Sequence, residues 1–250
     1  MIKFSNSELT EIQLVSTSKG NQRKFIAREK YLVKGRFVYQ GKEWRDDLVE
    51  VIASEIGKQL TNTGIRVIEQ QICNIGSYSR LWDKSRRFIS YKRLGGSLPV
   101  SASIDEKWST IVSTVIGITG LDMTEYLIVM ALIDYIVGNE DRHLNNFGVW
   151  YNSETEGYEI APLFDFGLGL FEHDCRYDGL PLRKCITKME CKPFSKNNER
   201  VIDCLSRSVE LTGYFSNGID LTGVELPSDK AGSYIRNRCM HLGIELRGVD

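Results

Sequence analysis

Three polar residues near the middle of the chain have the types and the spacing that phosphoryl transfer needs. Asp141 and Asn146 are five positions apart, and Asp165 follows in the sequence Phe-Asp-Phe-Gly at 164–167. An aspartate can accept the proton of an attacking hydroxyl, while an amide and a second carboxylate can hold a divalent cation on nucleotide phosphates. We therefore predict that Asp141 is the catalytic base and that Asn146 and Asp165 bind the metal.

Two further residues lie between the expected base and the amide. Arg142 and His143 complete the sequence Asp-Arg-His at 141–143. A guanidinium pairs well with a carboxylate or a phosphorylated side chain, so we expect Arg142 to find such a partner in the 167–195 loop. We expect His143 to pack under the metal loop. Both are predicted to support the site without taking part in the chemistry.

A lysine upstream is a candidate for the nucleotide phosphates. Lys34 closes the apolar run Tyr-Leu-Val at 31–33, and a lysine at the end of such a strand can reach the α- and β-phosphates if a helix carboxylate holds it. The helix predicted at 46–60 offers Asp46, Glu50 and Glu55. Asp46 and Glu50 share a face, and their spacing alone does not choose between them.

The segment 16–24 is small, polar and basic, and it lies between two strand-like runs. Such a loop can present backbone N–H groups and lysine charge to phosphate oxygens, so Gly20, Gln22 and Lys24 are candidate ATP contacts. It is neither a G-x-G-x-x-G nor a G-x-x-x-x-G-K-[ST] loop. A basic hairpin turn fits this segment equally well.

The elements that must position these residues fall into two groups. The first half predicts a small sheet and one helix, with strands near 11–16, 24–28, 30–34, 65–72 and 87–91 and the helix at 46–60. The second half is mainly helical, with helices at 104–116, 123–137, 199–211 and 228–242 and two short strands at 147–151 and 159–164. The segment 167–195 is expected to be long and irregular, which is typical of functional loops. Gly95-Gly96 marks the expected boundary between a first lobe, 1–96, and a second, 97–250.

Composition gives wide limits. The chain has 250 residues, a net charge of −1 and 26% charged side chains, which does not favour direct nucleic-acid or membrane binding. The longest apolar run, 126–138, is interrupted by Asp134 and is too short to span a bilayer. The sequence shows no secretory signal and its six cysteines form no C-x-x-C pair, so we expect a cytoplasmic protein with reduced thiols, or one secreted as an effector.

These motifs together resemble the HipA-like family of bacterial serine/threonine kinases. Asn-Glu-Asp-Arg-His-x-x-Asn at 139–146 is similar to the catalytic loop of that family, and Asp165 falls at its second metal ligand. Lys34 resembles the phosphate-binding lysine, and Gly-x-Gln-x-Lys at 20–24 resembles the nucleotide loop. The family pattern favours Glu50 as the helix glutamate, with Asp46 in reserve. The extra N-terminal subdomain of longer members has no counterpart, since the loop begins near residue 16.

The resemblance implies an α+β, bilobal protein-kinase-like fold with a small β-rich N-lobe and a larger, mainly helical C-lobe. It also implies ATP and Mg²⁺ as cofactors, a protein substrate, and an antitoxin or other regulatory protein as a partner. Autophosphorylation is expected on Ser16, Thr17 or Ser18, where added charge would repel the loop from the nucleotide. By the same resemblance the hinge falls at 88–92, where the backbone of Ser90 and Lys92 is expected to contact adenine.

Two other functions remain open at the level of sequence. A phosphoinositide-type lipid kinase also carries Asp-Arg-His-x-x-Asn followed by Asp-Phe-Gly, although the mixed charges of 167–195 do not favour lipid headgroups. A pseudokinase that binds nucleotide or a partner protein is the second alternative. The presence of Lys34, Asp141, Asn146 and Asp165 together argues against it.

Overall fold

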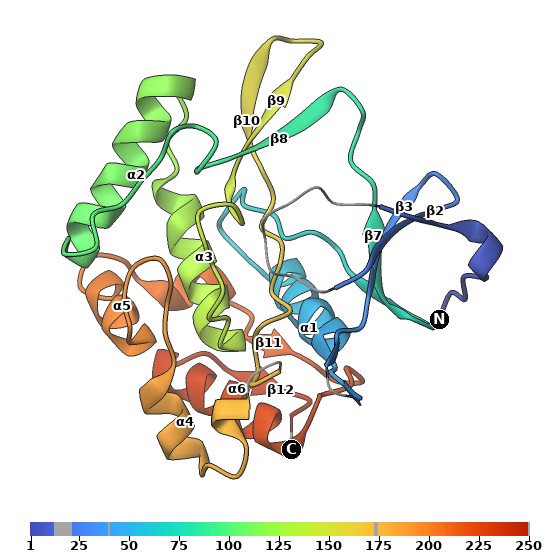
Figure 1. The fold of residues 1–250 in the computed structure, drawn as a ribbon. Coiled ribbons are helices and arrows are strands. Elements are labelled where there is room, and N and C mark those ends of the chain that lie inside the picture. Colours follow the sequence, from blue (N-terminus) through green and yellow to red (C-terminus); the bar gives the residue numbers. More distant parts are fainter. Residues whose placement is uncertain (13–21, 40, 173–174, 250) are drawn as a thin grey trace.

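The computed structural model describes residues 1–12, 22–39, 41–172 and 175–249 (Figure 1). Its first part is a five-stranded antiparallel sheet with strand order β1-β2-β3-β7-β6. The strands are β1 (Leu9–Glu11), β2 (Lys24–Ala27), β3 (Tyr31–Gly35), β6 (Gln71–Cys73) and β7 (Gly76–Arg80), preceded by a 3₁₀ turn at Asn6–Glu8. A small hairpin, β4 (Val38–Tyr39) and β5 (Lys42–Glu43), leads into helix α1 (Asp46–Lys58).

Helix α1 connects this sheet to the rest of the molecule. Its apolar residues recur at helical spacing and are buried, Ile52 and Ile56 among them. The helix packs against β6 and β7 on one side and against the central helix α3 on the other. A separate small core of aromatic and aliphatic side chains covers the other face of the sheet: Phe4, Phe25, Ala27, Val33, Cys73 and Tyr78. The sheet is thus packed on both faces.

A second, three-stranded sheet links the two parts of the chain. It consists of β8 (Arg86–Ser90), β9 (Gly148–Asn152) and β10 (Gly157–Ile160), with β9 in the middle. The expected boundary at Gly95-Gly96 groups residues 86–90 with the first lobe, whereas their pairing partner β9 follows α3. By this pairing, the chain leaves the five-stranded sheet at Arg80 and crosses through 81–85.

The second part is mainly helical. It contains α2 (Ile104–Thr119), α3 (Thr124–Val137), α4 (Leu182–Lys188), α5 (Asn198–Leu205) and α6 (Asp229–Leu242), with 3₁₀ turns at Cys175–Tyr177 and Leu211–Phe215 and a parallel pair, β11 (Ile219–Asp220) and β12 (Leu246–Arg247). A capping box between Ser103 and Glu106 begins α2. The architecture is the expected one: a β-rich N-terminal part and a helical C-terminal part.

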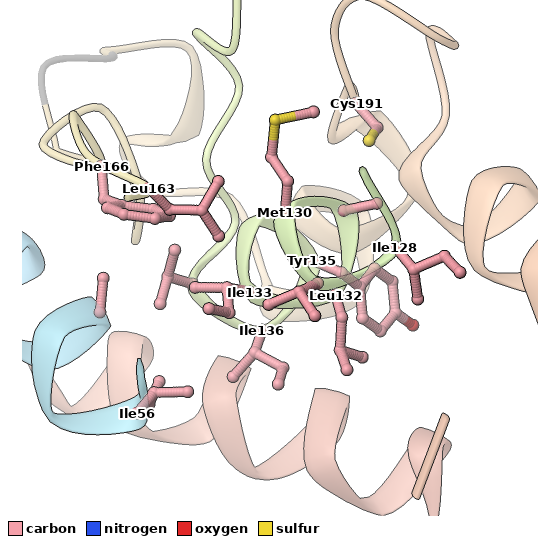
Figure 2. Packing of buried hydrophobic residues seen from close by; sticks show 14 of the residues in the cluster. Ile56, Ile128, Met130, Leu132, Ile133, Tyr135, Ile136, Leu163, Phe166 and Cys191 are labelled. Atoms are coloured by element: carbon pink, nitrogen blue, oxygen red, sulfur yellow. The ribbon is translucent and has the colours of Figure 1, made fainter. Parts of the chain in front are cut away.

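Helix α3 is the centre of the large core. Twelve of its fourteen residues, from Tyr126 to Val137, are buried, as the nearly continuous apolar run predicts. Figure 2 shows Ile133 and Ile136 of this helix in the same cluster as Ile56 of α1, with Leu163 and Phe166 nearby. The residues that follow α3 therefore begin from a fixed point in the core.

The connection after α1 is hydrogen-bonded to the second part of the molecule. The amide of Ile68 donates to Leu163 O (2.9 Å), and the amide of Leu163 donates to Arg66 O (2.8 Å). The amide of Thr61 donates to Tyr214 O (2.8 Å). Of the strand expected at 65–72, only a bridge at Val67 and the short β6 are formed. The backbone groups of Arg66 and Ile68 instead form hydrogen bonds with Leu163 in the second part of the molecule.

Helix α4 is an element that the sequence did not predict, since 167–195 was expected to be irregular throughout. In the described part of the chain, none of the helices combines the length and the apolar character that crossing a bilayer requires.

Candidate active site

The loop 139–146 takes its shape from the end of α3. Gly138 ends the helix with φ 59° in the left-handed region, and a Cβ there would lie 2.8 Å from Met189 Sδ, so glycine is required at this turn. Asn139 then donates from Nδ2 to Asp134 Oδ1 (2.8 Å), and its Oδ1 accepts from the amide of Asp141 (3.2 Å). The position of Asp141 is thereby set by the carboxylate that interrupts the apolar run.

Arg142 holds the loop from inside and is fully buried. Its Nε and Nη2 donate to the two oxygens of Asp134 (2.9 and 2.8 Å), and its Nη1 donates to Asn146 O (3.1 Å) and to Phe164 O. The prediction of a partner in the 167–195 loop is wrong, because both guanidinium edges face α3 and the two backbone segments that carry Asn146 and Asp165. Arg142 therefore fixes the loops of Asn146 and Asp165 relative to each other.

Asp141 and Asn146 lie side by side in the loop. Asn146 donates from Nδ2 to Asp141 O (3.1 Å) and from its amide to His143 O (2.8 Å), so the donor end of the side-chain amide is occupied and the oxygen end is left for another ligand. Burial raises the pKa of Asp141, while the charges of His143 and Lys192 act in the opposite direction. His143 is half-buried and its Nδ1 accepts from the amide of Asn145 (3.3 Å), so it lies beside Asp141 rather than packed beneath the metal loop.

Lys34 joins the two lobes at the site. The buried ammonium pairs with Glu50 of α1 and with Asp165 Oδ1 (2.8 Å). Of the two candidate helix carboxylates, Glu50 and not Asp46 is therefore the one that pairs with Lys34. Burial alone would lower the pKa of Lys34, but the charges of Asp165 and Glu50 outweigh it and hold the pKa above its usual value.

Asp165 is held in an unusual backbone conformation. Its φ of 66° lies in the left-handed region, which costs a non-glycine residue roughly 1–3 kcal/mol. Burial would raise its pKa, but the Lys34 and Lys24 charges lower it well below its usual range, so it is a carboxylate. The next residue, Phe166, is buried in the large core beneath the Arg142 guanidinium, which lies 4.6 Å from the ring centroid.

A second lysine faces the same site. Lys24 on β2 is directly opposite Lys34 on β3, and paired residues in an antiparallel sheet lie on the same face. Burial lowers the pKa of Lys24, and the Lys34 charge lowers it further. In the described chain Lys24 has no ion-pair partner. Two half-buried or buried cations therefore lie side by side where only Asp165 and Glu50 balance them.

Gln22, the first described residue of the candidate nucleotide loop, donates to the Asp46 side chain. Asp46 also accepts from the amide of Phe37 (3.1 Å). Asp46 therefore holds Gln22, and with it this part of the loop, at the start of α1. The other predicted loop residues, Ser16, Thr17, Ser18 and Gly20, lie outside the described residues.

The donor set suits a magnesium ion that is shared with a nucleotide. Asn146 and Asp165 supply oxygen atoms, which Mg²⁺ prefers, and it commonly takes only one or two carboxylates with the rest from phosphates and water. Among the described residues there is no group of three or more His, Cys, Asp or Glu side chains that could hold a metal. The oxygen atoms of Asn146 and Asp165 therefore fit a magnesium ion.

The expected hinge contacts are not available in full. The amide of Lys92 donates to Leu144 O (2.9 Å), and the carbonyl of Ser90 accepts from the amide of Leu94 (3.0 Å). Ser90 Oγ lies 3.3 Å from Asn145 Oδ1. The Lys92 amide is therefore not free to contact adenine, because it already donates to Leu144 O just beyond the end of β8. The crossing at 81–85 is the better candidate for the hinge.

Sequence reasoning missed Glu140, which immediately precedes Asp141. Its carboxylate accepts from Tyr177 Oη (2.8 Å) and from the amide of Glu190 (2.9 Å), and Arg176 lies 3.6 Å away. The side chain is only 9% exposed. The sequence shows an acidic residue next to Asp141, but its partners are 37 and 50 residues away and no local pattern points to them.

Comparison with known proteins bears on the fold. No protein-family model matches the chain, and no curated protein sequence matches it either. Among solved structures, 15 chains match. One is the crystal structure of a proinflammatory kinase, CtkA, from Helicobacter pylori, with a TM-score of 0.62 and 17% identity over 96% of this chain and 94% of that one. At this identity the likeness shows a kinase-like fold over nearly the whole chain.

Proposed function

We propose that this protein is an ATP- and magnesium-dependent serine/threonine protein kinase of the HipA-like type. The observation that carries the proposal is the pairing of Lys34 with both Glu50 and Asp165. In protein kinases a strand lysine held by a helix glutamate contacts the nucleotide phosphates, and the aspartate of Asp-Phe-Gly holds magnesium. The kinase-like fold and the sequence of the catalytic loop support the same function.

Each residue then has a role that its surroundings favour. Asp141 accepts the proton of the acceptor hydroxyl, for which a pKa raised by burial is suited. Lys34 and Lys24 neutralise phosphate charge, while Asn146 and Asp165 would hold the metal. Magnesium, when bound, neutralises charge on the phosphates as the bond to the leaving oxygen breaks. Arg142 holds the loops that carry Asn146 and Asp165 in fixed positions relative to each other.

The first test is transfer of labelled phosphate from ATP to mixed protein acceptors. We expect transfer in the presence of Mg²⁺, loss of transfer with excess EDTA and recovery when Mg²⁺ is restored in excess, because Asn146 and Asp165 cannot neutralise phosphate by themselves. Phosphopeptide mapping of the kinase itself is expected to find phosphate on Ser16, Thr17 or Ser18. The measurements are scintillation counting and mass spectrometry.

The competing functions give different results in the same assay. A lipid kinase would label phosphoinositide vesicles and leave protein acceptors unlabelled. A nucleotide-binding pseudokinase would bind ATP without transferring phosphate to any acceptor. A protein substrate is part of the proposal, and an antitoxin or other regulatory partner is a further part of it by resemblance.

Lys24 is predicted to contribute to ATP binding. Hydrogen bonds to charged groups contribute about 1.5–3 kcal/mol, so Lys24→Met should raise the KM for ATP by about tenfold or more and change kcat less. Steady-state kinetics at varied ATP measure this. Lys30→Met is the matched control, since Lys30 is exposed in the β2–β3 turn. An unchanged KM in Lys24→Met would show that Lys24 does not contact the phosphates.

A further inference from the structure

Positive charge is concentrated in the segment that follows the metal loop. Residues 175–192 carry five basic side chains, Arg176, Arg183, Lys184, Lys188 and Lys192, and two acidic ones, Asp178 and Glu190, in a chain whose net charge is −1. The segment forms the 3₁₀ turn at Cys175–Tyr177 and helix α4. Lys188, in the last turn of α4, has no ion-pair partner in the part of the chain that the structure describes.

A pocket of about 470 Å³ opens on this segment and is lined by Arg176, Tyr177 and Lys188. Its volume is in the range of ligand sites. Tyr177 forms a fixed wall, because its carbonyl accepts from Lys230 Nζ (2.7 Å) and its hydroxyl donates to Glu140. Arg176 and Lys188 are exposed at the rim. The pocket therefore presents the Lys188 ammonium beside the Arg176 guanidinium, which pairs with Glu140, on a base that Tyr177 fixes.

The pocket is attached directly to the catalytic loop. Glu140 contacts Tyr177 and Arg176 on one side, and it also accepts from the amide of Glu190, just beyond α4. Glu140 directly precedes Asp141 in the chain. Arg176 is the one cation among these donors and offsets the charge of Glu140, so the positive charge that remains at the pocket is that of Lys188.

We propose that this pocket binds an anionic side chain, a carboxylate or a phosphorylated residue, of the polypeptide that accepts the phosphate. Lys188 supplies the net charge, Arg176 offers the guanidinium N–H groups that Glu140 does not occupy, and Glu140 joins the pocket to Asp141. The proposal rests on the protein kinase function proposed above and adds its substrate class: serine or threonine polypeptides with an acidic or already phosphorylated residue near the acceptor.

A polypeptide fits the surroundings better than a membrane does. Membrane-surface sites combine basic residues with exposed apolar side chains. The large exposed hydrophobic residues of the described chain are Met1, Val38, Val100, Ile116, Ile118, Leu168 and Met240, and none falls within 175–192. A lipid headgroup is therefore treated as an alternative outcome.

The test compares serine peptides in which a single glutamate or phosphoserine is moved position by position around the acceptor. At the best position we expect kcat/KM about tenfold above that of the neutral peptide, since one or two partly exposed ion pairs each contribute up to about 1 kcal/mol. In Lys188→Gln this ratio should fall towards one. Lys3→Gln, an exposed lysine that precedes the 3₁₀ turn at Asn6–Glu8, is the matched control and should keep the wild-type ratio.

Binding measured without turnover separates the two proposals. Fluorescence polarisation of the same peptides on the Asp141→Asn protein should show the preference for the acidic peptides, and Lys188→Gln in that background should remove it. Transfer to all peptides with equal efficiency, or a preference that survives Lys188→Gln, overturns the pocket proposal but leaves the kinase function in place. A binding preference with no transfer to any acceptor overturns the kinase function instead. Lys188-dependent binding to phosphoinositide vesicles without any peptide preference assigns the pocket to a lipid headgroup and overturns the proposal. Glutamate and phosphoserine peptides show which anion it prefers.

Discussion

Asp141→Asn should lower phosphoryl transfer by a factor of about 10²–10⁴, the usual contribution of a general base, while ATP binding stays close to that of the wild type. The asparagine side chain has the same shape but cannot take the hydroxyl proton. The backbone contacts of residue 141 with Asn139 and Asn146 do not involve the carboxylate, so the loop should keep its structure. Single-turnover transfer of labelled phosphate measures the chemistry, and isothermal calorimetry measures nucleotide binding.

Asp203→Asn is the matched control for this substitution. Asp203 is exposed on α5, away from the catalytic loop, and its replacement should leave both measurements unchanged. If Asp141→Asn retained more than about a tenth of wild-type transfer, another group would have to act as the base. If it lost ATP binding as well, the role of Asp141 would be structural.

Asp134→Ala should lower the free energy of unfolding by about 3–5 kcal/mol, because it leaves the guanidinium of Arg142 buried without its carboxylate. Both oxygens of Asp134 accept from Arg142, and Oδ1 also accepts from Asn139. Urea denaturation followed by circular dichroism measures the change. Asp122→Ala is the control: Asp122 is an exposed acid whose Oδ1 accepts from the amide of Thr124 (2.8 Å), and losing this one bond should cost about 1 kcal/mol.

A milder variant keeps this prediction testable if Asp134→Ala fails to fold. Asp134→Asn removes the charge but keeps a hydrogen-bonding side chain, so it should unfold at a lower urea concentration than the wild type and at a higher one than Asp134→Ala. Because Arg142 also holds Asn146 O and Phe164 O, kcat should fall in Asp134→Asn even where the protein is folded. A cost below about 1 kcal/mol for Asp134→Ala would mean that Arg142 finds another partner.

The residues of the proposed chemistry form a pattern that the sequence alone displays, because they are close together in the chain. Asp141, Asn146 and Asp165 follow a pattern of spacing that needs no knowledge of the fold. Asp134 gave a weaker signal as the acid that interrupts an apolar run, but its partner could not be read from the sequence: Arg142 was assigned to the wrong segment. Glu140 has partners 37 and 50 residues away, and no local pattern encodes such contacts.

The strands also show that local sequence does not encode every contact that shapes the fold. β2 and β3 were found because apolar and β-branched residues mark them, whereas β7 has the sequence Gly-Ser-Tyr-Ser-Arg and carries no such mark. It is a strand because it pairs with both β3 and β6, and Gly76 allows the close approach, since a Cβ there would lie 2.0 Å from Lys34 O. Residues 65–72 have the opposite character: their composition favours a strand, but most of them cross between the lobes.

The hydrogen bonds of the segment after α1 limit how the two lobes can move. Control by displacement of this helix is common in kinases, because it breaks the lysine–glutamate pair. Here α1 is followed at once by residues bonded to the second lobe, through Thr61, Arg66 and Ile68, and its own face packs on α3. Glu50 therefore lies on a helix that is held from both sides, by α3 and the segment 61–68 on one side and by β6 and β7 on the other. Rotation of α1 alone would break both sets of contacts. A change that separates Lys34 from Glu50 would therefore have to move the β1–β3 strands relative to α1, and whatever binds those strands would control the ion pair.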